Sequence, residues 1–134
     1  MLHAPDADPE SYEVRMATVG AVAIRERIAG LEAGEPVDRP VELQGLRLGP
    51  IALLGAPLEI FQAIKNDVVA RAAGPVTLVT SFANDSIGYA PDQAAAERGG
   101  YAADMVPFIA GTLPYANAHE ELVEALLRVD AELA

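Results

Sequence analysis

The sequence predicts an α/β fold in which a hairpin leads into one right-handed βαβ unit, with a helix at each end of the chain. Two short apolar runs, 51–55 and 76–82, lie on either side of a helical stretch at 58–73. Apolar residues also recur every three or four positions in 14–32 and in 118–133, which is typical of amphipathic helices. Strands joined by such a crossover run parallel, so we expect a small mixed sheet flanked by N- and C-terminal helices.

The composition fits one domain over residues 1–134 and disfavours several classes of partner. Twenty acidic residues against nine basic residues give a net charge of −11, which disfavours nucleic acid and anionic membrane surfaces. No apolar run approaches the roughly 20 residues of a bilayer span, so we expect no transmembrane segment. The polar N-terminus does not resemble a signal peptide, and the default location is therefore cytoplasmic. The sequence has no cysteine, which excludes disulfides and thiolate metal sites.

The N-terminal third is expected to hold an irregular segment, a helix and a hairpin. Prolines and acids make 1–13 irregular, and a helix follows over 14–32. A strand is predicted over 41–48, and the phase of its apolar residues slips at Gly45, which favours a bulge there. Gly49 and Pro50 then turn the chain into the next strand. The apolar face of the first helix is predicted to be Ala17, Ala21, Ile24, Ile28 and Leu31.

The middle and end of the chain hold one well-marked helix each. The helix over 58–73 places Phe61, Ile64, Val68 and Ala72 on one face, and Gly74 ends it. The following run, 76–82, alternates little, which predicts a strand buried on both faces. The stretch 83–115 reads as a long irregular loop with one short helix near 91–97. Asn117 is a good N-cap for the last helix, and Glu120 has the spacing of a capping box.

Two polar residues follow the carboxyl ends of the two predicted parallel strands. Ligands in open α/β sheets bind beyond such ends, and Glu59 and Tyr89 both lie there. Each also has a simpler interpretation. Glu59 would be the third residue of its helix, where a carboxylate is favoured by the helix dipole by about 0.3–1 kcal/mol. Tyr89 would be a half-buried tyrosine bonded to backbone. Asn84 and Asp85 suit a turn, and Gly88 relieves crowding before Tyr89.

Other catalytic arrangements have little support in the sequence. The two histidines, His3 and His119, are far apart, and no histidine pair has the spacing of a zinc motif. His119 is expected to be a surface residue of the last helix. No histidine or lysine is placed to activate a serine, so a hydrolase triad is not indicated. No glycine-rich phosphate loop is present.

Three segments in order resemble the neutral/alkaline ceramidase family. Gly49-Pro50-Ile51-Ala52-Leu53-Leu54-Gly55-Ala56-Pro57-Leu58-Glu59 resembles the segment in which an apolar strand runs into Pro-Gly-Glu. Val79–Tyr89 resembles the later segment in which Asn is followed, after four residues, by Tyr. Glu97-Arg98-Gly99-Gly100-Tyr101 resembles the Gly-Gly-Tyr or Arg-Tyr-Glu element after a short helix. The order and spacing agree from about Leu48 to Ala103.

The resemblance implies a zinc-dependent amidase that cleaves N-acyl sphingoid bases. It implies that Glu59 and Tyr89 are metal ligands, with Asn84, Asp85, Gly88 and Tyr101 in a surrounding site loop and the catalytic residues unknown. Two features depart from the family: its Gly is Leu58 here, and its Phe-Thr after the Glu is Ile60-Phe61. The family's two zinc histidines come from upstream sequence that has no counterpart in this chain.

We therefore interpret the chain as the C-terminal portion of a larger ceramidase-like hydrolase, or as a free-standing relative that lost the metal site. In either case, this chain alone is expected to be inactive. Its expected partner is an N-terminal hydrolase portion or a second copy of itself. Two other functions stay open. One is a structural or interaction module in which Glu59 caps a helix, and the other is a small-molecule-binding domain that uses Tyr101, Phe108 and Tyr115.

Overall fold

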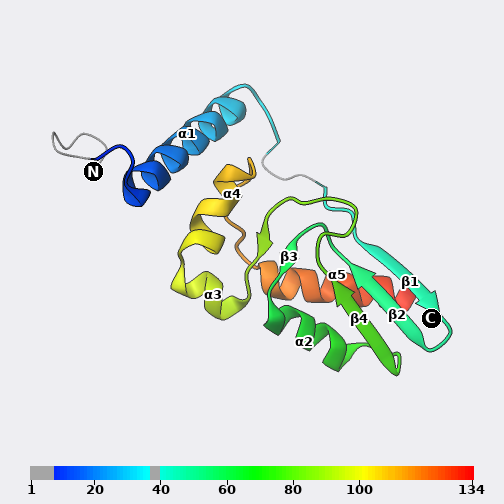
Figure 1. The fold of residues 1–134 in the computed structure, drawn as a ribbon. Helices are drawn as coiled ribbons and strands as arrows, with labels where there is room; N and C mark the ends of the chain where they lie inside the picture. The colour runs from blue at the N-terminus through cyan, green and yellow to red at the C-terminus, as the bar shows by residue number, and fades with distance from the viewer. Residues whose placement is uncertain (1–7, 37–39) are drawn as a thin grey trace.

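The computed structural model describes residues 8–36 and 40–134 and has the α/β architecture that the sequence predicts (Figure 1). Its main sheet has three strands in the order β1–β2–β4. Strands β1 (Gln44–Leu48) and β2 (Ile51–Gly55) form the expected antiparallel hairpin. Strand β4 (Val76–Thr80) pairs parallel to β2, which confirms the βαβ unit.

The predicted bulge at Gly45 is wrong. Hairpin pairing runs without interruption from Gln44 opposite Gly55 to Leu48 opposite Ile51. Glycine is required at this position for another reason, because an added Cβ would overlap Cγ1 of Val129 and lie 2.8 Å from Cδ1 of Leu133. The last helix therefore approaches the hairpin closely, and glycine is the residue that leaves room for it.

One face of the main sheet packs on two helices, α2 (Gln62–Arg71) and α5 (Ala118–Glu132). Asn117 is the N-cap of α5 as predicted, but its side chain makes no capping bond, so the predicted capping box does not form. The helices and the sheet enclose one apolar core. Its members are Leu54, Ala56, Leu58, Ile64, Val68, Ala90, Leu122, Val123 and Leu126.

A buried ion pair fixes α5 to the hairpin and to the end of α2. The Asp130 carboxylate is only 2% exposed and accepts a hydrogen bond of 2.9 Å from the Arg47 guanidinium. Its other oxygen accepts a bond of 3.0 Å from the backbone N–H of Ala73. Arg47 also donates to the carbonyl of Leu133 at 2.9 Å. This network therefore joins three separate segments of the chain.

The opposite face of the main sheet is open, which corrects the prediction that 76–82 is buried on both sides. Along β4, Thr77 is buried and Val79 half-buried, whereas Val76 and Leu78 are exposed. The period of two expected for a strand with one covered face is thus present. The sequence hid this alternation because the exposed positions Val76 and Leu78 are apolar while the buried position is Thr77.

The predicted irregular loop 83–115 contains four short elements instead. These are β5 (Tyr89–Ala90), α3 (Gln93–Arg98), the π-helix η1 (Tyr101–Met105) and α4 (Val106–Ile109). Helix α3 confirms the short helix expected near 91–97, and Asp92 caps it by accepting from Ala95 N at 2.9 Å. None exceeds six residues, so none leaves a clear periodicity in the sequence.

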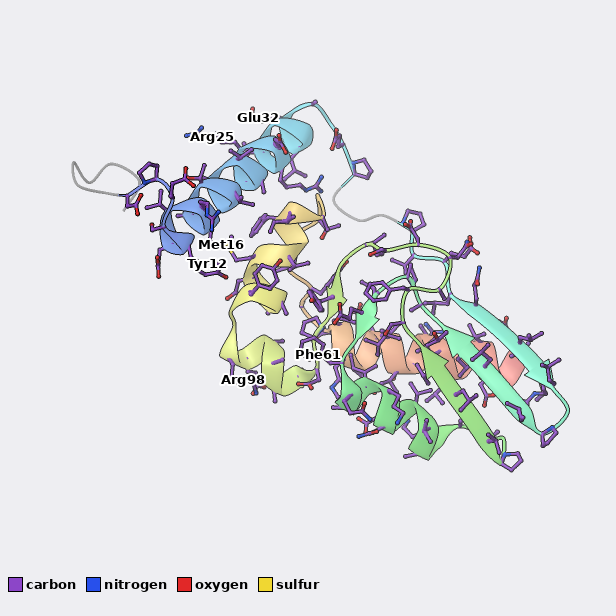
Figure 2. All side chains as sticks on the ribbon, viewed as in Figure 1. Tyr12, Met16, Arg25, Glu32, Phe61 and Arg98 are labelled. Carbon is purple, nitrogen blue, oxygen red and sulfur yellow. The ribbon has the colours of Figure 1, made fainter. Side chains whose placement is uncertain are left out.

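Helix α1 (Tyr12–Glu32) packs against α4 and lies apart from the main sheet (Figure 1). It begins two residues earlier than predicted, with Ser11 as its N-cap. Residues 1–7 of the predicted irregular segment lie outside the described residues. The predicted apolar face is partly wrong, because Ile24 and Ile28 are exposed while Gly20, Ala23 and Arg27 are buried. Arg25 projects from α1 away from α4 (Figure 2).

No helix in the described part of the chain combines the length and apolar character that crossing a membrane requires.

Candidate functional site

Glu59 and Tyr89 lie directly opposite each other in a second, two-stranded sheet. Strand β3 (Glu59–Ile60) pairs parallel to β5, with Glu59 opposite Tyr89 and Ile60 opposite Ala90. Paired residues of parallel strands point to the same face, so the carboxylate and the phenol share one side. Ile60 and Ala90 face the other side and join the core. The predicted convergence of these two residues is therefore present.

Tertiary pairing also explains why Glu59 does not cap a helix. The N–H of Glu59 donates to the carbonyl of Gly88 at 2.8 Å, and the N–H of Phe61 donates to the carbonyl of Ala90 at 3.1 Å. Between them, the N–H of Ile60 donates to Oγ of Ser81 at 2.9 Å. These bonds hold 59–61 extended, so α2 begins at Gln62 rather than at Leu58. The helix-capping interpretation of Glu59 is wrong for this reason.

Aromatic rings surround Tyr89 on two sides. The ring of Phe61 lies 6.0 Å from that of Tyr89 at an interplanar angle of 87°. The ring of Tyr101 lies 6.4 Å away at 70°. Both are edge-to-face contacts, which typically add about 0.5–1.5 kcal/mol and fix ring orientation. Figure 2 places Phe61 between the start of α2 and α3. These contacts hold Tyr89 beside Glu59.

The neighbouring carboxylate affects the acidity of the phenol. The charge of Glu59 raises the pKa of Tyr89 above its usual value of 10.0. Partial burial, a hydrogen bond with the Glu59 side chain and the nearby Tyr101 act in the same direction. A neutral phenol can donate to a carboxylate, whereas two anions side by side repel. The raised pKa therefore favours the protonated phenol of Tyr89 beside the Glu59 carboxylate.

The loop between β4 and β5 brings only some of the predicted site residues to this pair. Gly88 adopts φ = 118°, a conformation that favours glycine, and its carbonyl receives the N–H of Glu59. Tyr101 contacts Tyr89, as described above. Asn84 instead bonds to the Glu42 carboxylate at 3.4 Å, and Asp85 bonds to the N–H of Ser86 at 2.7 Å. Asn84 and Asp85 thus stabilise the loop.

Sequence reasoning missed two residues of the site, Phe61 and Ser81. Phe61 was placed on the buried face of α2, but it precedes that helix and packs on Tyr89. Ser81 supports the backbone of Ile60. The next residue, Phe82, has φ = 56°, which is uncommon for a bulky side chain and marks a sharply turned segment after β4. Only the pairing of β3 with β5 reveals these roles.

His119 is not the free surface residue that the sequence suggested. Its Nδ1 accepts from the N–H of Gln93 at 3.2 Å, and its Nε2 lies 2.9 Å from Oδ2 of Asp67. The side chain is 16% exposed and joins α5 to α3 and α2. Since Nδ1 accepts, the ring proton is on Nε2 and faces Asp67. His3 lies outside the described residues.

Glu59 and Tyr89 offer two oxygen atoms to a metal ion. Carboxylate oxygen is a zinc ligand, and the phenol of Tyr89 offers a second oxygen beside it. Within residues 8–36 and 40–134, no three His, Cys, Asp or Glu side chains are grouped so that they could hold one metal ion. Zinc usually needs at least three protein ligands. Glu59 and Tyr89 are therefore too few to hold zinc by themselves, although each offers an oxygen donor.

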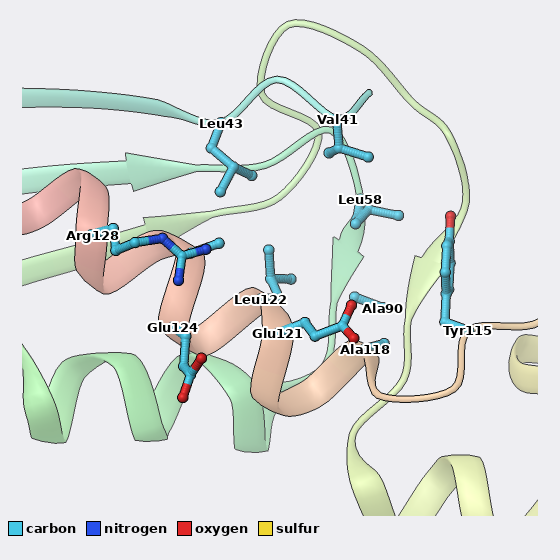
Figure 3. A pocket seen from close by; sticks show the side chains of 11 residues that line it. Val41, Leu43, Leu58, Ala90, Tyr115, Ala118, Glu121, Leu122, Glu124 and Arg128 are labelled. Carbon is cyan, nitrogen blue, oxygen red and sulfur yellow. The ribbon is translucent and has the colours of Figure 1, made fainter. Parts of the chain in front are cut away.

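A separate cavity lies on the other side of β3 and β5. Its volume is about 430 Å³, and Leu58, Ala90 and Tyr115 form part of its lining. Figure 3 shows Leu122 at its wall and Arg128 and Glu121 extending along α5 at its margin. Because Leu58 and Ala90 alternate with Glu59 and Tyr89 along their strands, the cavity does not open on the carboxylate–phenol pair.

Comparison of the chain with protein-family models, with curated proteins and with solved structures found no match.

Proposed function

We propose that this chain is the C-terminal portion of a ceramidase-like zinc amidohydrolase. In this proposal Glu59 and Tyr89 are two of the metal ligands, and the zinc-binding histidines come from an N-terminal hydrolase portion outside the chain. The substrate class is an N-acyl amide, and the chain alone is inactive. The cytoplasmic location expected from the sequence remains a prediction.

The register of β3 and β5 is the observation that most strongly supports the proposal. The two residues picked out by the resemblance are 30 positions apart in sequence, yet they are direct partners in a two-residue parallel ladder. The positive φ of Gly88 and the three backbone bonds at 59–61 hold this ladder in place. If the β3–β5 ladder only stabilised the core, its half-exposed face would not need a carboxylate and a phenol side by side.

The residues of this chain have clear roles in such a site. Zinc, when bound, polarises a carbonyl and lowers the pKa of a bound water. Glu59 supplies a negatively charged oxygen, and Tyr89 supplies a phenol that loses its proton when a cation replaces it beside Glu59. Phe61 and Tyr101 fix the orientation of the Tyr89 ring through edge-to-face contacts.

The test uses the longest reading frame that contains this chain. We expect it to carry two histidines of a zinc motif upstream and to purify with about one zinc per chain. Glu59→Gln and Tyr89→Phe should each lower zinc content and hydrolysis of an N-acyl amide by tenfold or more. The matched controls are Glu13→Gln and Tyr12→Phe on α1, which should change neither. Full zinc content in both site variants would contradict the proposal.

A second candidate is a non-catalytic domain that binds an apolar small molecule. The cavity of about 430 Å³ supports it, because small-molecule sites are typically of about 300–1,000 Å³ and mostly apolar. Tyr115, which the sequence singled out, lines this cavity, whereas Tyr101 contacts Tyr89 instead. An apolar fluorescent dye should bind the wild type, and Ala118→Trp should block it while thermal unfolding is unchanged. Equal dye binding by both proteins would exclude this cavity as the site.

A further inference from the structure

The open face of the main sheet carries six aliphatic side chains and no charged one. Two rows cross the strands in register. The first contains Leu46, Leu53 and Leu78, and the second contains Leu48, Ile51 and Val76. These six residues, which we call the open sheet face, are each between 39% and 65% exposed. Gln44 and Thr80 continue the face at one end and are uncharged.

No helix in the described part of the chain covers this face. Helices α2 and α5 both pack on the opposite side, where Ala52 and Leu54 are fully buried. Helix α1 packs against α4, away from the three strands (Figure 1). Sheets with a parallel pair are usually covered on both faces, so an aliphatic face of this kind indicates a missing layer.

The open sheet face has about half the area of the smallest specific protein interfaces. At roughly half exposure, its six residues present on the order of 500 Å² of mostly apolar surface, about the largest patch usual for a monomer. Two such faces together would bury on the order of 1,000 Å², which is about the lower limit for a specific interface. The area therefore suits self-association of one sheet on another.

The charge distribution also permits two copies to meet at this surface. The chain has a net charge of −11, which would oppose association through most of its surface. The six residues of the open sheet face carry none of this charge, and the Glu42 carboxylate at its end is bonded to Gln44 and Asn84. A hollow of about 410 Å³ lies beside Leu46, Leu53 and Thr80. Side chains of a second copy can insert into it.

We propose that the open sheet face is the interface of a homodimer in which the main sheets of two copies pack face to face. The two copies are related by a twofold axis, so both rows of one copy contact the open sheet face of the other. Two sheets packed in this way lie about 10 Å apart, with their strands inclined at about 30°. The interface is independent of Glu59 and Tyr89, which lie in the second sheet.

The test is the oligomeric state of the full chain, measured by sedimentation equilibrium between 1 and about 200 µM. The wild type is expected to be a dimer over most of this range. Leu46→Glu combined with Leu78→Glu should weaken dimerisation at least 100-fold, because it buries like charges in the interface. The matched control is Ile28→Glu on α1, which is 50% exposed and lies off this face. It should leave the dimer intact.

Circular dichroism and thermal unfolding show whether the double variant is folded. If it is not, Leu46→Thr combined with Leu78→Thr takes its place, since threonine suits strands and removes apolar area. Raising the salt concentration should not weaken the dimer, because its contacts are apolar and the distant charges become screened. A monomeric wild type at 200 µM, a polydisperse oligomer, or an Ile28→Glu variant that dissociates would each overturn the proposal.

Discussion

At the scale of single residues, two carboxylates behave differently because of what surrounds them. Glu59 lies on a half-exposed face beside a phenol, and its charge raises the pKa of Tyr89. Asp130 is buried in the core and neutralised by Arg47. The first is thus placed where a ligand can reach it, and the second only joins parts of the fold. The sequence alone did not separate these roles.

We expect Glu59→Gln to lower the pKa of the Tyr89 phenol toward 10.0, since it removes the main cause of the shift. Because the folded-state pKa is raised, its contribution to stability is fully present below the ordinary tyrosine pKa. It is lost as pH rises through the raised value. A spectroscopic titration near 295 nm, with Tyr89→Phe to assign the signal, measures this. An unchanged Tyr89 titration in Glu59→Gln would contradict the contact.

We expect Asp130→Ala to destabilise the protein by about 3 kcal/mol, because it leaves the Arg47 guanidinium and the Ala73 N–H without their buried acceptor. Urea unfolding followed by circular dichroism measures the change in free energy. Glu132→Ala is the control, since Glu132 is exposed two residues further along α5. Its effect should stay within about 0.5 kcal/mol. Similar effects of the two substitutions would argue against the network.

At the scale of elements, long-range pairing decided where local preference pointed elsewhere. Pro57 and Glu59 favour a helix start, but the bonds of β3 with β5 delay α2 to Gln62. The apolar alternation slips at Gly45, which suggested a bulge, but the hairpin is regular there. Glycine stands at this position because α5 occupies the space that a Cβ would fill. In both cases the deciding partner is at least 21 residues away in sequence, so the residues around each position do not reveal it.

We expect Gly45→Ala to destabilise the protein by about 1–3 kcal/mol, because its Cβ overlaps Val129 and Leu133. The cost should fall when the same change is made in a Val129→Ala background, which removes the nearest atom. A double-mutant cycle from urea unfolding measures this coupling. Additive effects would show that Gly45 does not contact α5 in solution.

At the scale of the whole molecule, the core depends on the C-terminal helix and not on the N-terminal one. The main core cluster takes Leu122, Val123 and Leu126 from α5 and no residue from α1. Helix α1 is attached through its contacts with α4, and Gly20 faces Met105, the last residue of η1. The chain therefore has one sheet-and-helix body, and α1 and α4 lie beside it.

We expect a variant without residues 1–36 to keep a cooperative unfolding transition, because the main core cluster loses no member. A variant without residues 117–134 should not fold, since it loses the α5 side of that core. Amide hydrogen exchange of β2, measured by NMR, distinguishes the two results. Loss of β2 protection in the first variant would show that α1 is part of the same cooperative unit.

The sequence by itself determined the elements whose signals are local. Apolar periodicity and turn residues located the hairpin, α2, β4 and α5, and the parallel β2–β4 pair followed from the length of the crossover. The same reasoning brought Glu59 and Tyr89 to one edge. These features follow from local periodicity and from the length of a single crossover, both of which can be read along the sequence.

Only the tertiary structure decided what lies on each side of these elements. It paired Glu59 with Tyr89, added Phe61 and Tyr101 around them, and left one face of the main sheet open. Leu53 and Leu54 are neighbours of the same type, yet one is exposed and the other fully buried. Hydrophobicity states that a side chain favours burial, but only the arrangement of helices around the sheet determines which side chains are covered.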